Sequence, residues 1–184
     1  MELQTINLKN CEKDYFYKSW ELYESSFPSE EKRTLKEQNT IIKNENYNPI
    51  AFIKDENIVA ILFFWSFTQH TFIEHFAVNP TLRGQSYGSK ILEDFLSRHN
   101  NCILEIELLS DHITKKRFDF YKRFDFVINE HKHFQIPFRQ NSEKLELLLL
   151  SYKDTLTKNE YDNLYLQMKN SLTVVENFNK GGIK

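Results

Sequence analysis

The residues best placed for chemistry are Gly84 and Gly88, in a chain that otherwise avoids glycine. The sequence holds four glycines in 184 residues, and the other two lie near its C-terminus. Glycine weakens helices and strands, and it is favoured where the backbone turns sharply or approaches a ligand closely. Segment 83–88 (RGQSYG) follows a predicted strand that ends at Pro80 and precedes a predicted helix. It is therefore the first candidate for a binding loop.

A strand, a glycine-containing loop and a helix in this order are typical of an anion site. The first turn of a helix leaves backbone N–H groups without partners, and the helix dipole adds about half a positive charge there. A phosphate binds these donors without a lysine, and Arg83 would add a fixed positive group. A P-loop is excluded, because four residues separate its two glycines and three separate Gly84 from Gly88. Its lysine also follows the second glycine directly, whereas Lys90 lies two positions after Gly88. The alternative is an ordinary strand-to-helix turn.

Hydrophobic periodicity predicts the elements that position this loop. Segments 50–54, 58–67 and 71–78 are predicted strands joined by hairpin turns. Segment 86–99 is a predicted helix with one apolar stripe, and 102–108 alternates strictly as a strand. The remaining predictions are strands at 2–8, 126–134 and 145–152 and helices at 15–26, 29–43, 110–123 and after the capping box of Thr157 and Glu160. This order indicates an α/β domain of the α+β type, with helices on a mainly antiparallel sheet.

Composition predicts a single soluble domain that spans residues 1–184, with 178–184 as a mobile tail. A chain of this length with 40% apolar residues can bury one sizeable core. A net charge of −2 and dispersed basic residues give no general attraction to nucleic acid or to a membrane surface. The apolar runs are too short to span a bilayer, and the N-terminus lacks a signal segment. Cys11 and Cys102 fit a reducing compartment, so we expect a cytoplasmic protein.

Two motifs resemble those that bind acetyl-CoA in the GCN5-related N-acetyltransferase (GNAT) superfamily. Segment 77–88 (AVNPTLRGQSYG) matches the hydrophobic-Val-x-Pro segment and the Arg/Gln-x-x-Gly-x-Gly/Ala loop, with Ser86 where the family most often has glycine. Segment 120–126 (FYKRFDF) matches Phe-Tyr-x-x-x-Gly-Phe, with Asp125 in place of glycine. The resemblance covers about Phe52 to Phe126. It implies a GNAT-like, mixed sheet of about seven strands flanked by helices, with acetyl-CoA as cosubstrate and no metal.

The resemblance also implies where acetyl-CoA would lie. The strand that ends at Val78 would splay from the strand that starts near Cys102, and the cosubstrate would occupy the opening. Backbone groups of Phe76 and Val78 would pair with the pantetheine arm, and the Val78 N–H would polarise the thioester carbonyl. The predicted binding residues are Phe76, Ala77, Val78, Arg83, Gly84, Gln85, Ser86, Tyr87, Gly88 and Ser89.

Tyr121 and Glu74 are the candidate catalytic groups. A phenol with a pKa of about 10 keeps its proton at neutral pH, so Tyr121 is the predicted general acid for the departing thiolate. Glu74 is the predicted base for the amine, because it lies in an apolar strand on the same face as Phe76 and Val78. The alternatives are a buried aromatic for Tyr121 and a carboxylate paired with lysine or arginine for Glu74.

Five further polar residues have competing interpretations. Glu105 and Glu107 share one strand face, so they either line the acceptor site or are paired or solvated. His75 is predicted to be packed opposite Glu74. His131 and His133 lie two positions apart without a third metal ligand, so no metal site is predicted.

The leading functional prediction is an N-acetyltransferase that moves the acetyl group of acetyl-CoA to a primary amine of a small molecule or peptide. The amine attacks directly in a ternary complex. The alternative is a non-catalytic acyl-CoA-binding sensor or interaction module on the same fold. A homodimer is an expectation from similar proteins alone. Acceptor selectivity is assigned to the first two helices and the closing strands, whose aromatic residues form a rim or a core: Trp20, Tyr23, Phe27, Phe134 and Phe138.

Overall fold

The computed structural model of the protein describes residues 3–138 and 144–173 and is built on one sheet of eight strands. The strand order is β1-β2-β3-β4-β5-β8-β6, and β7 pairs with β8. The strands are β1 (Gln4–Asn7), β2 (Tyr47–Lys54), β3 (Asn57–Ser66), β4 (Thr71–Val78), β5 (Cys102–Glu107), β6 (Phe126–Ile128), β7 (His133–Phe134) and β8 (Glu146–Tyr152). All strand pairs are antiparallel except β4 with β5, which confirms the predicted fold class. The predicted tail at 178–184 lies outside the described residues.

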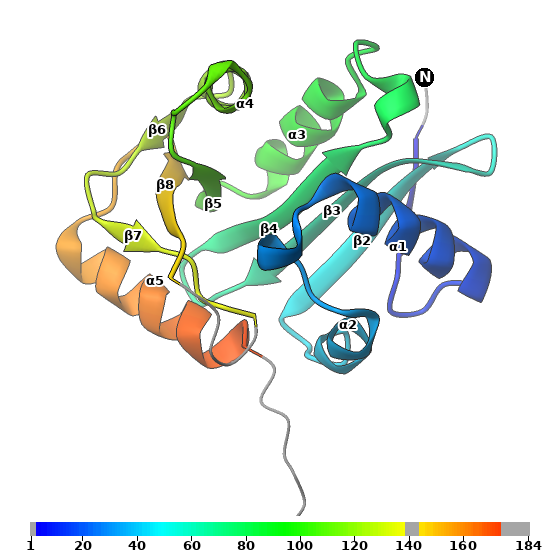
Figure 1. The fold of residues 1–184 in the computed structure, drawn as a ribbon, viewed down its shortest axis with the longest axis horizontal. Helices are drawn as coiled ribbons and strands as arrows, with labels where there is room; N and C mark the ends of the chain where they lie inside the picture. Colours follow the sequence, from blue (N-terminus) through cyan, green and yellow to red (C-terminus); the bar gives the residue numbers. More distant parts are fainter. Residues whose placement is uncertain (1–2, 139–143, 174–184) are drawn as a thin grey trace, which may run out of the picture.

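Helices cover both faces of the sheet (Figure 1). They are α1 (Lys13–Ser26), α2 (Leu35–Ile41), α3 (Tyr87–Arg98), α4 (His112–Lys122) and α5 (Lys158–Ser171), with short 3-10 helices η1 (Ser29–Glu31) and η2 (Pro80–Leu82). In Figure 1, α3 and α4 lie above the sheet, and α1, α2 and α5 lie below it. Because both faces are covered, residues 58–65 of β3 are buried without alternation. None of the helices in the described ranges is long and apolar enough to span a membrane.

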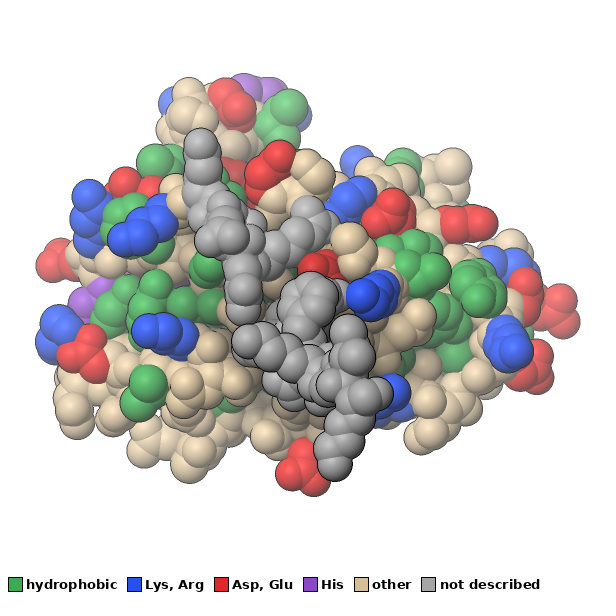
Figure 2. All heavy atoms as spheres, turned by 60° about the horizontal axis from the view of Figure 1, so that its bottom comes forward, with side chains coloured by type: hydrophobic (Ala, Val, Ile, Leu, Met, Phe, Trp, Pro, Cys, Tyr) green, Lys and Arg blue, Asp and Glu red, His purple; other side chains and the backbone are tan. Residues whose placement is uncertain are grey.

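Charge is mixed over the surface that Figure 2 shows. On this face the Lys and Arg side chains stand among Asp and Glu side chains, without a continuous area of one sign among the described residues. This agrees with the dispersed charges and the small net charge of the sequence.

The predicted helix over 29–43 is wrong, because the chain forms two separate elements there. The 3-10 helix η1 ends at Glu31, and α2 begins only at Leu35. Thr34 caps α2 and forms a capping box with Glu37. Arg33 lies between the two elements with a fully buried side chain. A continuous polar helix would hold Arg33 on an exposed surface, so its burial requires the interruption.

The predicted strand over 126–134 is also divided, into β6 and β7. The chain leaves the sheet at Asn129, whose side-chain amide donates to the Leu149 carbonyl at 3.2 Å and to Ser151 Oγ at 2.9 Å. Its side-chain oxygen accepts the Leu156 N–H at 2.7 Å. These bonds to the side chain take the place of a continued ladder. A smaller difference concerns β2, which begins at Tyr47, three residues before the start of the strand predicted over 50–54.

The parallel pair β4 and β5 separates after a short contact. The register joins Thr71 to Ile73 of β4 with Cys102 to Leu104 of β5, and no further pair follows among the described residues. Beyond this point β4 stays with β3, and β5 stays with β8. The predicted splay between the two strands is therefore confirmed, and it opens the sheet at its centre.

Candidate active site

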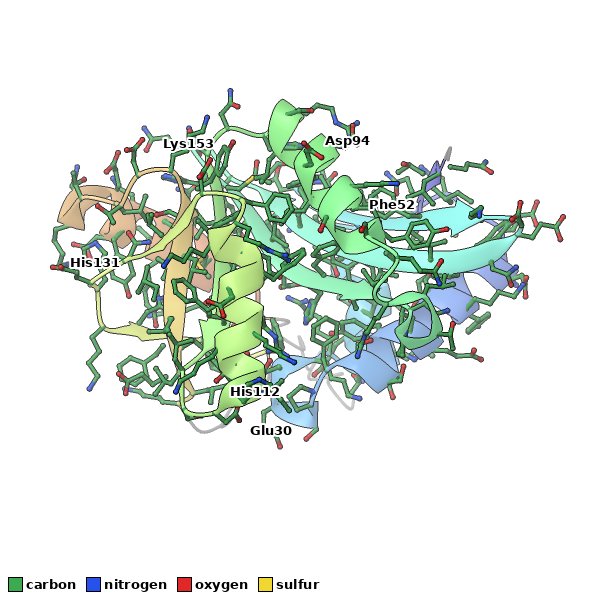
Figure 3. The ribbon with its side chains drawn as sticks, turned by 90° about the horizontal axis from the view of Figure 1, so that it is seen from above. Glu30, Phe52, Asp94, His112, His131 and Lys153 are labelled. Atoms are coloured by element: carbon green, nitrogen blue, oxygen red, sulfur yellow. The ribbon has the colours of Figure 1, made fainter. Side chains whose placement is uncertain are left out.

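The splay between β4 and β5 leads into a cavity of about 730 Å³. On one side of the sheet its walls are the loop before α3, the start of α3, and α4. On the other side they are the end of α1, η1 and the segment around Gln135 and Phe138. Figure 3 looks onto the face with α3 and α4, and it shows the start of α4 (His112) and η1 (Glu30) at the same end of the molecule. Except for Gln85, every predicted site residue lines this cavity.

The start of α3 has the geometry of an anion site. Ser86 is the N-cap in a left-handed conformation (φ 62°, ψ 13°), and its side chain does not cap the helix. The Lys90 N–H bonds the Ser86 carbonyl, so the N–H groups of Tyr87, Gly88 and Ser89 lack helical partners. Gly84 is also left-handed (φ 79°). The backbone thus adopts glycine-like conformations at both positions, although only Gly84 is a glycine.

Gly88 brings α3 close to both β4 and α4. A Cβ atom at this position would lie 3.2 Å from Val78 Cγ2 and 3.7 Å from Phe120 Cζ. A side chain longer than methyl would therefore extend into the cavity wall between these residues. The two predicted motifs meet here, because Val78 belongs to the first and Phe120 to the second.

Backbone groups of Phe76 and Val78 face the opening. The Asn79 N–H donates to the Val59 carbonyl at 2.9 Å, and Ala60 lies opposite Val78 in the register. In an antiparallel ladder, hydrogen-bonded and non-bonded pairs alternate. Val78 and Phe76 are therefore non-bonded with β3 and direct their N–H and C=O groups to the β5 side. Since β5 has separated there, this edge of β4 is free to pair with a ligand.

Tyr121 reaches the same cavity from α4. Its ring is buried beside Phe126 and Phe120, and its hydroxyl makes no hydrogen bond to another described residue. Burial raises the pKa of Tyr121 to about 12, with smaller opposing effects from Arg117 and Glu107. The phenol is therefore protonated throughout the neutral range.

The predicted orientation of Glu74 is wrong because β4 contains a bulge. His75 lies opposite Phe63 and Ile73 lies opposite Phe64, so Glu74 is an extra residue in β4. The bulge turns Glu74 to the face of the sheet that carries Trp65, whose indole Nε1 donates to Oε1 at 3.0 Å. The side chains of Phe76 and Val78 pack into the core on the other face.

Glu74 is the centre of a buried ion pair. Arg33 donates to both its oxygens, with Nη1 at 2.6 Å and Nη2 at 2.8 Å. Burial by itself raises the pKa of Glu74, but the charge and hydrogen bonds of Arg33 and His75 outweigh it and lower the pKa to about 2. A carboxylate with this pKa and these donors is a weak base. These contacts fit the alternative interpretation of Glu74, a carboxylate paired with lysine or arginine.

Sequence reasoning missed Arg33. Its Nη2 also donates to the Leu172 carbonyl at 2.8 Å, and its guanidinium lies 4.2 Å from the centre of the Phe138 ring. The available signal was Glu74, since a carboxylate in an apolar strand requires a cation. The sequence offers many candidate cations, and only the fold selects Arg33.

The other predicted polar residues have defined partners. His75 packs in an aromatic cluster, as predicted, and its Nε2 lies 2.8 Å from the Glu31 carbonyl. The prediction that it lies opposite Glu74 is wrong, because the bulge puts both side chains on one face, with His75 Nδ1 3.4 Å from Glu74 Oε2. Glu107 pairs with Arg117, and Glu105 pairs with His133. Burial raises the pKa of the Cys102 thiol to about 12, which makes it a poor nucleophile. Within the described ranges, no group of at least three His, Cys, Asp or Glu residues could hold a metal ion.

The predicted aromatic set divides between core and cavity. Phe27 and Phe138 line the cavity on the side of α1. Tyr23 is buried in the core, Trp20 packs against that core, and Phe134 lies in β7. This aromatic set therefore contributes residues both to the cavity wall and to the core.

Comparison with known proteins connects this site to a family. Residues 12–126 match the profile of the Acetyltransferase (GNAT) family. The Bacillus subtilis (strain 168) protein YjbC, an acetyltransferase by name, is 30% identical over 136 residues, which cover 69% of this chain and 67% of YjbC. A Bacteroides thetaiotaomicron structure, by name a GNAT-family acetyltransferase, superposes with a TM-score of 0.83 at 24% identity, covering 96% of this chain and 100% of that one. A Bacillus subtilis acetyltransferase in complex with CoA has a TM-score of 0.56 at 12% identity, with coverages of 82% and 98%.

Proposed function

We propose that this chain, which belongs to the acetyltransferase (GNAT) family, transfers the acetyl group of acetyl-CoA to a primary amine of a small molecule or peptide. The observation that carries the proposal is the free edge of β4 in the same cavity as the start of α3 and the Tyr121 hydroxyl. Together they supply a groove for an extended arm, donors for phosphate and a proton for a leaving group.

The cosubstrate would bind along one continuous surface. Its pyrophosphate would accept the N–H groups of Tyr87, Gly88 and Ser89, with Arg83 as an added positive charge. Its pantetheine arm would pair with the Phe76 and Val78 backbone as an added strand. Gln85 is exposed and does not line the cavity, so we assign it no side-chain contact.

The reaction would be a direct attack in a ternary complex. The neutral amine attacks the thioester carbonyl carbon, and the Val78 N–H stabilises the negative charge that develops on the carbonyl oxygen. The carbon–sulfur bond then breaks, and Tyr121 donates its proton to the thiolate. Glu74 is a poor proton acceptor at a pKa of about 2. We therefore assign it a positioning role, in which it fixes Arg33 and the bulge of β4.

The first test is thermal unfolding with acetyl-CoA, CoA and ATP, because it requires no acceptor. A ligand at about 100 times its Kd stabilises a protein by about 2.7 kcal/mol, which raises Tm by several degrees. We expect the shift with acetyl-CoA and CoA, but not with ATP. Gly88→Glu should lose it, since the longer side chain enters the cavity, whereas Gly88→Ala should keep it. Equal shifts for Gly88→Glu and the unaltered chain would place the ligand elsewhere.

The second test is thiol release from acetyl-CoA with phenethylamine, putrescine and a short peptide with a free N-terminus. Amine-dependent release supports the transferase. Binding without release for every amine would favour the alternative, an acyl-CoA-binding sensor. The features that favour this alternative are the left-handed Ser86 and Asp125, where the family most often has glycine, and Thr114, where the family frequently has asparagine.

A further inference from the structure

We propose that Glu105 accepts the proton of the incoming ammonium group, and that His133 and Tyr161 conduct this proton from the cavity to the surface. The inference rests on the proposed transferase function. It fills the role for which Glu74 is unsuited, and it gives the buried His133 a part in the reaction.

The three residues form a continuous chain of short contacts. Glu105 lines the cavity with a side chain that is 10% exposed, and its Oε1 lies 2.5 Å from Nε2 of His133. His133 is fully buried, and its Nδ1 lies 3.2 Å from the Tyr161 hydroxyl. Tyr161 is partly exposed on α5 and also donates to the Lys132 carbonyl at 3.3 Å. A proton that enters at Glu105 therefore has a hydrogen-bonded route outward.

The outer end of this chain lies away from the cavity mouth. The His131 ring stacks on Tyr161 with centroids 4.4 Å apart. In Figure 3, His131 lies beside α5, far from His112 and Glu30, which are next in sequence to the cavity-lining residues Ile113 and Glu31. The substrates and the released proton would thus use separate parts of the surface.

The neighbouring carboxylates fit this role less well. Arg117 pairs with Glu107, and Arg33 occupies both oxygens of Glu74. Glu31 also lines the cavity, and burial, followed by the charge of Glu107, raises its pKa. Among the described residues, its side chain has no contact that would carry a proton onward, so Glu31 fits a binding role for the ammonium group better than a place in the relay. The titratable and charged groups around Glu105 are Glu31, Glu74, His75, Glu107, Arg117, Tyr121, His133, Tyr161 and Tyr165.

Every proton in this scheme has a destination. The ammonium group gives one proton to Glu105, and the neutral nitrogen then forms the bond to the carbonyl carbon. When the carbon–sulfur bond breaks, Tyr121 protonates the thiolate, and a proton from the nitrogen restores the phenol. The products are the amide, the free thiol and one proton, which leaves through His133 and Tyr161. Burial raises the pKa of Tyr161 to about 12, so its hydroxyl relays the proton without ionising at neutral pH.

The test is the pH profile of Glu105→Gln with whichever amine of the panel the unaltered enzyme uses best. Without a base, only amine that is already neutral reacts. We therefore expect kcat to fall about 10²–10⁴-fold near pH 7. The logarithm of kcat/KM should then rise with a slope of about one per pH unit up to the pKa of the amine used, which is about 10.4 for a lysine-type amine and about 7.7–8.0 for a peptide N-terminus. The unaltered enzyme should show no such rise over the same pH range. His133→Gln should lose less kcat near pH 7 than Glu105→Gln, and its activity should recover in the same way at high pH.

Two matched variants separate this role from a structural one. Glu107→Gln changes the next carboxylate on the same face of β5, and it should keep the wild-type shape of the profile. Glu31→Gln should raise KM for the amine and keep the shape as well. Acetyl-CoA binding and Tm of Glu105→Gln, measured alongside, separate lost chemistry from lost folding.

Each outcome decides between the two proposals. If the unaltered enzyme releases no thiol with any amine, the transferase function fails and the relay fails with it. If it turns over and Glu105→Gln follows its profile at every pH, the relay alone is wrong. A profile of slope one in Glu31→Gln instead would transfer the role to Glu31. If His133→Gln has a lower Tm but keeps the wild-type pH profile, the role of His133 is structural and it does not conduct the proton.

Discussion

Tyr121 keeps its proton and Glu74 loses its proton, although both side chains are buried beside the same cavity. Burial raises the pKa of both groups. Tyr121 has no partner that reverses this effect, and its pKa rises to about 12. Arg33 reverses it for Glu74, whose pKa falls to about 2. At the scale of single residues, the buried cation therefore keeps Glu74 a fixed anion, whereas Tyr121 stays protonated without one.

Tyr121→Phe should lower kcat by about 10²–10⁴-fold, because the thiolate would leave without a proton donor. The affinity for CoA should change little, since the ring and its packing remain. Steady-state kinetics and thermal shift with CoA measure the two effects separately. Tyr152→Phe, a tyrosine that does not line the cavity, is the control and should keep normal turnover. A Tyr121→Phe enzyme with normal kcat would remove Tyr121 from the mechanism.

At the scale of elements, the start of α3 determines the shape of the proposed phosphate site. Ser86 adopts φ 62° there, and a residue with a Cβ atom pays about 1–2 kcal/mol for this conformation. Asp125, at the end of the second motif, is in the same situation with φ 61°. Two element boundaries beside the cavity are therefore strained, and each lies where the family most often has glycine.

Ser86→Gly should stabilise the ligand-free protein by about 1 kcal/mol, because glycine reaches a left-handed conformation without steric cost. Denaturant unfolding measures the change. Ser89→Gly is the control in the same helix, where φ is helical, and it should destabilise by about 0.5–1 kcal/mol. A loss of stability in both variants would mean that the Ser86 conformation is not strained.

The sequence predicted these elements unequally, for identifiable reasons. Thr157 was predicted as a cap and does cap α5, and Asp111, one of two candidate caps with Ser110 for the helix predicted over 110–123, caps α4, because capping chemistry is local. The capping box of Thr34 and Glu37 was also present in the sequence, and it would have placed the start of α2 correctly. The bulge at Glu74 has no such signal, since β4 is apolar toward both faces. The position of the loop before α3 was therefore predictable, whereas the side-chain direction of the candidate base was not.

At the scale of the whole molecule, the pair of Arg33 and Glu74 joins parts of the chain that are far apart. Arg33 precedes α2, Glu74 lies in β4, and Leu172 follows α5. Breaking a buried pair by removing one partner leaves the other charge uncompensated, which costs about 3–5 kcal/mol. The pair thus contributes to the stability of the entire fold, and through Glu74 this stability depends on pH.

Glu74→Gln should remove a pH-dependent part of the stability. The folded pKa of Glu74, about 2, lies below its ordinary value of 4.5. The contribution, about 3 kcal/mol, is therefore complete above about pH 5 and is lost as pH falls toward 2. Unfolding free energies of Glu74→Gln and the unaltered protein should differ most at neutral pH and converge in acid. Asp94→Asn, which breaks an exposed pair with Arg98, should change stability by less than about 1 kcal/mol. Parallel curves for Glu74→Gln would contradict this assignment.

The bond from Arg33 to the Leu172 carbonyl spans 139 positions in the sequence, which has a consequence for synthesis on the ribosome. The guanidinium of Arg33 emerges from the ribosome well before Leu172, whose carbonyl accepts one of its hydrogen bonds. The nascent chain can assemble α3, α4 and most of the sheet beforehand, but the side of the sheet that faces α5 stays open. Arg33 therefore lacks its Leu172 partner until α5 docks, and Leu164, Met168 and Leu172 complete this side of the core in the same step.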